Sequence, residues 1–126
     1  MRAAGVALAA ALVSGWLAVV EVLWLPLRVF GTPAPLAIGL AVLGNLVLPP
    51  LTVLLSGARL TALVPAAAWL VVTVAAGQRT AEGDVVLTGS GLSVTFLLVG
   101  AVSAVVAVVR ELAQPPAPAG SDGARR

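Results

Sequence analysis

Residues 3–25 read AAGVALAAALVSGWLAVVEVLWL, and this stretch decides the fold class. Its only charged residue is Glu21. At about 1.5 Å of rise per residue, a helix of this length crosses a hydrocarbon core of roughly 30 Å. A cleaved signal peptide is the alternative, because Arg2 precedes the stretch and Ala7-Leu8-Ala9 matches a cleavage pattern. The apolar run exceeds the 7 to 15 residues or so of such peptides, however, and therefore favours a transmembrane helix.

Three further apolar stretches follow, at about 35–56, 60–76 and 91–109. Hydrophobic residues make up 60% of the chain and charged residues 10%, against roughly 45–50% and 25% in soluble domains. The sequence therefore predicts an all-α fold, a membrane bundle of four transmembrane helices, within residues 1–112. Residues 113–126, rich in Pro, Ala and Gly, are expected to form a disordered cytoplasmic tail.

The arginines predict how the helices are oriented, because cytoplasmic segments hold an excess of basic residues. All seven basic residues are arginines. With the N-terminus inside, the cytoplasmic arginines are Arg2, Arg59, Arg110, Arg125 and Arg126. Only Arg28 and Arg79 then lie outside. We expect a multi-pass protein of the cell membrane with both termini in the cytoplasm. The short link at 57–59 predicts that the second and third helices are antiparallel neighbours.

Composition also excludes several classes of function. The net charge is only +2 and the arginines are spread along the chain, so no basic patch for nucleic acid is expected. The chain has no Cys and no His, and thus lacks a thiolate nucleophile, an imidazole base and the usual zinc ligands. We expect a protein that is not an enzyme, has no cofactor and has the lipid bilayer as its surroundings.

Glu21 is the first candidate site residue, because an acid within a membrane span usually faces protein or a water-filled cavity. In the predicted topology it is level with Thr73, Ser93 and Thr95, and hydrogen bonds among these residues are plausible. One interpretation is a protonatable site for a transported cation. The other is an interfacial carboxylate paired with Arg28 or Arg79 and flanked by Trp24.

Asn45, Pro49 and Pro50 form the second candidate site, inside the predicted helix 35–56. Pro49 and Pro50 lack the N–H groups that would bond the carbonyls of Asn45 and Leu46, so a kink is expected. The freed carbonyls must face another helix, and the Asn45 amide can bond across to it. Broken helices of this kind line substrate sites in transporters; a packing kink with one interhelical hydrogen bond is the alternative.

The loop at 78–90 contains Glu82-Gly83-Asp84 followed by an apolar strip and a turn. Its two carboxylates are candidates for holding a cation or meeting a basic partner. A solvated loop resting on the headgroup boundary explains the same residues.

Two resemblances accompany these patterns. Asn45, Leu63-Val64-Pro65 with Trp69, and Gly83-Asp84-Val85-Val86 resemble a family of uncharacterised actinobacterial membrane proteins with four spans, which implies no activity. Glu21 on a first helix of four is also similar to the small multidrug-resistance transporters. Those transporters surround their acid with aromatic residues, whereas this chain has no Tyr.

Together these observations predict an accessory or scaffold subunit of a cell-membrane assembly, with other membrane proteins or a second copy as partners. The alternative is a small transporter, acting as a dimer, that uses Glu21 as a proton or cation site.

Overall fold

The computed structural model describes residues 1–25, 28–33, 36–78 and 91–115, with the backbone alone at 28–29 and 32–33. Its helices are α1 (Arg2–Trp24), α2 (Leu36–Ser56), the 3-10 helix η1 (Arg59–Ala62), α3 (Leu63–Ala76) and α4 (Gly91–Ala113). Each of α1, α2, η1 joined to α3, and α4 is long and apolar enough to cross a membrane. The predicted all-α bundle of four membrane-spanning helices is confirmed.

The boundaries differ from the sequence prediction in three places. The third span begins with a turn of 3-10 helix before α3. Helix α4 continues to Ala113, four residues beyond the predicted end and one into the predicted tail. Between α1 and α2 a short antiparallel hairpin, β1 (Arg28–Val29) with β2 (Thr32–Pro33), turns at Phe30 and Gly31. Both turn residues have positive φ, as a two-residue hairpin turn of type I′ requires.

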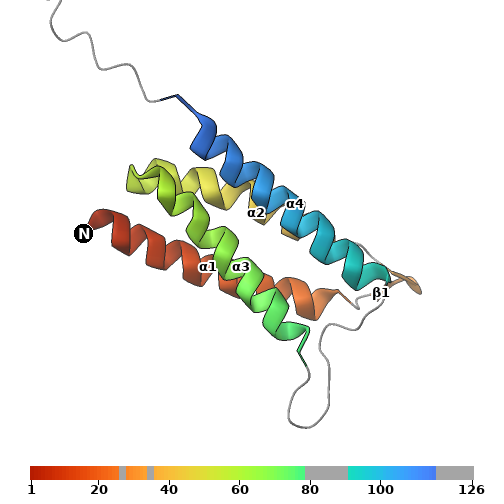
Figure 1. The fold of residues 1–126 in the computed structure, drawn as a ribbon. Coiled ribbons are helices and arrows are strands. Elements are labelled where there is room, and N and C mark those ends of the chain that lie inside the picture. Colours follow the sequence, from red (N-terminus) through yellow and green to blue (C-terminus); the bar gives the residue numbers. More distant parts are fainter. Residues whose placement is uncertain (26–27, 34–35, 79–90, 116–126) are drawn as a thin grey trace, which may run out of the picture.

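The helices pack unevenly. Helix α1 packs mainly against α3 and α2, α2 packs mainly against α4, and α3 and α4 touch each other little. Figure 1 shows α1 crossing α3, with α2 beside α4. The predicted neighbours α2 and α3 are antiparallel and in contact, but each packs more extensively on another helix. The backbones of α3 and α4 have few close contacts, and those of α1 and α4 have fewer still, so α3 and α4 meet mainly through side chains.

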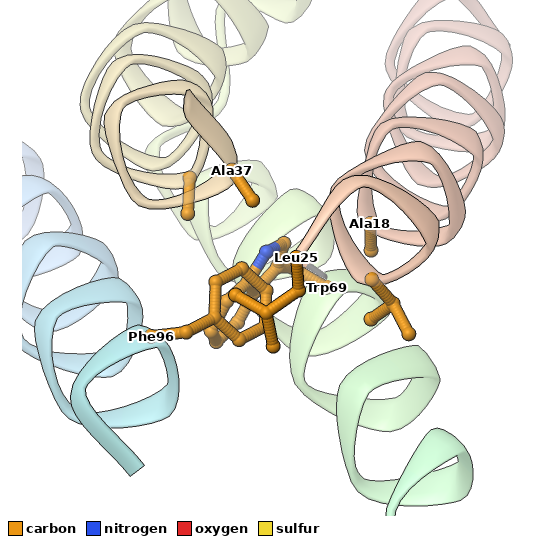
Figure 2. Close-up of a cluster of buried hydrophobic side chains, with 7 residues drawn as sticks. Ala18, Leu25, Ala37, Trp69 and Phe96 are labelled. Carbon is orange, nitrogen blue, oxygen red and sulfur yellow. The ribbon is translucent and has the colours of Figure 1, made fainter. Parts of the chain in front are cut away.

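The core is built from small residues that allow close approach and from one aromatic pair. Ala18 of α1 and Ala41 of α2 are fully buried. Small side chains suit membrane bundles, where helices associate through packing rather than through exclusion of water. Figure 2 shows Trp69 and Phe96 meeting at the centre of the cluster, with Ala18 close by.

The outer surface of the bundle is apolar. Trp16 is 70% exposed, and Leu12, Leu54 and Leu98 are exposed as well. Contiguous exposed apolar surface of this extent is unusual in soluble monomers. Lipid is the environment that suits it, and the fold is that of a multi-pass membrane protein.

One end of the bundle gathers the start of α1, the link between α2 and η1, and the end of α4 (Figure 1). Gly57 ends α2 with a φ of +74° while its N–H still bonds Val53 at 2.8 Å. The Arg59 guanidinium donates to the carbonyls of Gln114 and Pro115. Arg2, Arg59 and Arg110 therefore lie at the same end of the bundle.

Candidate functional site

Trp69, in the middle of α3, is the residue around which the interior is organised. It is only 2% exposed, and its indole N–H donates to Oε2 of Glu21 on α1 at 2.7 Å. An indole N–H in an apolar interior needs an acceptor, because no water is there to provide one. Glu21 is itself 0% exposed. The only acid within the described helices at membrane depth thus joins α1 to α3.

The six-membered ring of the Trp69 indole lies against α4. The ring centroid is 5.6 Å from that of Phe96, with the planes tilted by 51°, a favourable arrangement for aromatic pairs. Next to it, a Cβ added at Gly100 would lie 2.3 Å from Cη2 of Trp69. Glycine is therefore required at position 100 for the ring to occupy this place.

The carbonyl of Gly100 connects α4 to α2. Asn45 Nδ2 donates to it at 3.1 Å, and Ser103 Oγ donates to it from within α4 at 2.8 Å. Asn45 is 3% exposed. The hydrogen bond that the sequence predicted from Asn45 to another helix is confirmed. We name the set Glu21, Trp69, Gly100 and Asn45 the junction, because its four members join all four helices.

Helix α2 runs without interruption through Pro49 and Pro50 to Ser56. Pro49 is fully buried, and Thr52 Oγ1, one turn on, donates to the Leu48 carbonyl at 2.7 Å. This bond does not involve the carbonyls of Asn45 and Leu46, which the prolines leave without an N–H partner. The two prolines nevertheless lie within a continuous helix, unlike the discontinuous helices of many transporters.

Oε1 of Glu21 differs from the other polar atoms of the junction named above because it makes no hydrogen bond to a described residue. It is buried and has no hydrogen-bond partner among the described residues. It points toward α2, where a Cβ added at Gly44 would lie 3.7 Å from it. A buried acceptor without a partner costs about 1–3 kcal/mol, so this atom is a candidate for binding a proton or a donor group.

The other sequence-predicted partners of Glu21 divide into two groups. Hydrogen bonds among Glu21, Thr73, Ser93 and Thr95 were plausible from their shared level, but Thr73 and Thr95 bond elsewhere. Thr73 donates to Trp69 and Leu70, and Thr95 donates to Gly91, each within its own helix. A hydroxyl in a membrane helix finds the carbonyl three or four residues back without help from another helix.

The remaining candidates fall outside what the structure describes. Arg79, Glu82 and Asp84 lie in the segment 79–90, and at Arg28 only the backbone is described. Pairing of Glu21 with Arg28 or Arg79 stays a prediction. Within the described ranges, no group of three acidic, Cys or His side chains lies together as metal ligands would.

Sequence reasoning missed Trp69 and Gly100 as site residues. The sequence did contain a signal for Trp69. Tryptophan is typical of membrane interfaces, and a tryptophan in the middle of a span needs a buried acceptor for its N–H. Glu21 was the available acid. The signal for Gly100 was weak: Gly100 and Ala104 have the four-residue spacing of small residues that allows close helix contact, but such spacings arise by chance in an alanine-rich chain. Only the position of the indole ring shows that a side chain is forbidden there.

Three hollows lie between pairs of helices in the described part of the bundle, and Glu21 is not among the residues that line them. One of about 320 Å³ lies between α3 and α4, one of about 200 Å³ between α1 and α2, and one of about 380 Å³ between α2 and α4. Neither Glu21 nor Asn45 lines any of the three. Their linings are almost entirely apolar.

Comparison with protein-family models, with curated proteins and with solved structures gives no match to this chain. The two resemblances drawn from the sequence therefore stay predictions, and function has to be argued from the junction itself.

Replacing Asn45 with leucine should weaken the contact between α2 and α4. Interhelical hydrogen bonds in membrane proteins contribute about 0.6 kcal/mol on average and about 1.7 at most. We expect Asn45→Leu to lower the free energy of unfolding, measured by denaturant titration in detergent, by an amount in this range. Ser103→Ala is the matched control, because Ser103 bonds the same carbonyl from within α4. A larger loss in Ser103→Ala than in Asn45→Leu would contradict the assignment.

Proposed function

We propose that this protein is a non-catalytic accessory or scaffold subunit of a cell-membrane assembly, with both termini in the cytoplasm. The observation that carries the proposal is the closed interior. Glu21 and Asn45, the polar residues best suited to handle a substrate, are 0% and 3% exposed. Their side chains bond to other helices of the same bundle instead of facing a cavity.

The outside of the bundle supports the same function. Broad apolar faces of α1, α2 and α4 offer surface to helices of other membrane proteins. In lipid, such contacts depend on close packing, for which exposed small residues and shallow hollows are suitable. The orientation rests on Arg2, Arg59 and Arg110, which share one end of the bundle, because basic residues favour the cytoplasmic side.

Crosslinking in native membranes, followed by affinity purification in mild detergent and mass spectrometry, tests the proposal. We expect at least one membrane protein to be recovered with the chain in reproducible proportion. Recovery of the chain alone, without crosslinked partners, would contradict an accessory role.

One observation favours a second candidate, a small transporter that uses Glu21. Oε1 of Glu21 has no described hydrogen-bond partner, and an intramembrane carboxyl group that can gain and lose a proton is a common element of transporters. In this alternative the bundle must open between α1 and α2, where Oε1 faces Gly44.

Glu21→Gln separates the two candidates. The glutamine amide oxygen can accept the Trp69 N–H, so the junction keeps its hydrogen bond but loses the titratable group. For an accessory subunit we expect unchanged thermal stability in detergent and unchanged recovery of partners.

For a transporter, the same variant should abolish uptake of protons or cations into liposomes that wild-type protein supports. Glu111→Gln, near the end of α4, is the control for loss of a carboxylate elsewhere. A stable Glu21→Gln protein that no longer recovers its partners would contradict a purely structural role for Glu21.

A further inference from the structure

Helices α3 and α4, whose backbones have few close contacts, border a groove of about 320 Å³. Trp69 is one of its lining residues. The other lining residues are all aliphatic: Leu63, Ala66, Ala67, Leu70, Ala101, Ala104, Val105, Val108 and Val109. Alanines stand on both walls of the groove, Ala66 and Ala67 on α3 and Ala101 and Ala104 on α4, and leave this space between the two helices. An empty groove of this kind would forfeit dispersion contacts along its walls, so an apolar chain should fill it.

A cationic group lies at one end of this groove. Arg59 precedes Leu63 by one turn, and its guanidinium reaches the carbonyls of Gln114 and Pro115 just beyond α4. It therefore links the start of the third helix to the end of the fourth, the two helices that line the groove. Among the described residues no carboxylate pairs with it, so its charge is free to attract an anion.

Arg110 is at the same end but on a different face. At 100° per residue, it is turned about 180° from the middle of the α4 groove face, which runs through Ala101, Ala104, Val105 and Val108. Its side chain is exposed. The two arginines lie at the same end of the bundle, but only Arg59 joins the two helices that line the groove.

We propose that the α3–α4 groove and Arg59 form a binding site for one anionic phospholipid, with an acyl chain along the groove and the phosphate at Arg59. Charge complementarity selects this occupant. Basic side chains beside grooves between membrane helices bind acidic headgroups, and a guanidinium matches the geometry of phosphate oxygens. A zwitterionic lipid offers the same chain but no net charge, and a partner helix would fill the groove without using Arg59.

Native mass spectrometry of the purified full-length chain tests the site. The protein is mixed with equimolar phosphatidylglycerol and phosphatidylcholine of identical acyl chains, and the retained lipids are counted at rising collision energy. Wild type should retain phosphatidylglycerol in preference. Arg59→Gln should bring the ratio of the two lipids close to one, Arg59→Lys should keep most of the preference, and Arg110→Gln should leave it unchanged.

The groove is tested separately by filling it. Ala67 is exposed and lines the groove, whereas Ala75 is an exposed alanine of α3 outside it. Ala67→Leu should reduce retention of both lipids, and Ala75→Leu should not. Equal retention of the two lipids by wild type, or equal effects of Arg59→Gln and Arg110→Gln, would overturn the proposal. A change from dimer to monomer in Ala67→Leu with lipid retention intact would also overturn it, because a second copy would then occupy the groove.

Discussion

Trp69→Ala is expected to lower the free energy of unfolding by about 3–5 kcal/mol, the range for removing a large buried aromatic side chain. Two losses combine in this variant. The ring no longer fills the space between α1, α3 and α4, and helix association in lipid depends on that packing. Oε2 of Glu21 also loses its donor, which leaves both carboxyl oxygens without a described partner. Denaturant titration in detergent, followed by circular dichroism, measures the change.

Trp16→Ala is the matched control, because Trp16 is 70% exposed on the lipid-facing side of α1. We expect it to change the same free energy by less than about 0.5 kcal/mol, as is usual for surface positions. Trp69→Phe separates the two losses, since it keeps an aromatic ring and removes the N–H. It should cost about 1–3 kcal/mol, the penalty for an unpaired buried polar group. Similar stabilities for Trp69→Ala and Trp16→Ala would contradict the central place of Trp69.

Gly100→Ala is expected to have the second largest effect, a loss of about 1–3 kcal/mol from overpacking. The added methyl group would lie 2.3 Å from Cη2 and 2.4 Å from Cζ2 of Trp69. Both are atoms of a rigid, buried ring, so either the ring or α4 must move. Movement of α4 would also lengthen the bond from Asn45 to the Gly100 carbonyl. Unfolding in detergent gives the stability, and indole fluorescence reports on the ring.

A double variant tests this clash directly. Trp69→Phe removes the part of the ring that the new methyl group would meet, so Gly100→Ala should cost less in its presence than in wild type. Gly39→Ala on α2 is the control, because an added Cβ there meets nothing within 4 Å. It should not lower stability, since alanine favours helix over glycine. Additive losses in the double variant would contradict the contact between Trp69 and Gly100.

The number and approximate extent of the helices could be predicted because they depend on length and apolar character alone. The contacts between helices could not. Each helix is apolar nearly all round, so the sequence does not mark which face is turned inward. Glu21 and Asn45 are exceptions, and their burial followed from the cost of polar groups in lipid. For Asn45, this reasoning reached the right kind of bond although not the acceptor.

The partner of Glu21 illustrates why the depth of a residue in the membrane was insufficient to predict which side chains bond to each other. Thr73 was a plausible partner because it lies at the same level as Glu21, but its hydroxyl bonds carbonyls of α3. Trp69 lies one turn earlier and reaches Glu21 because its side chain is long and its N–H has no acceptor within its own helix. The crossing of α1 and α3, which sets this distance, depends on small side chains at their contact and appears only in three dimensions.

A solid-state NMR distance between the Trp69 indole nitrogen and the Glu21 carboxyl carbon tests the junction most directly. Protein in lipid bilayers would carry ¹⁵N in the indole rings and ¹³C in the Glu side-chain carboxyl groups, and the chain has only three Trp residues to distinguish. The hydrogen bond of 2.7 Å between Nε1 and Oε2 predicts a weak but measurable dipolar coupling that disappears in Trp69→Phe. A coupling that is absent in wild type, or that persists in Trp69→Phe, would show that the four helices do not meet around this pair.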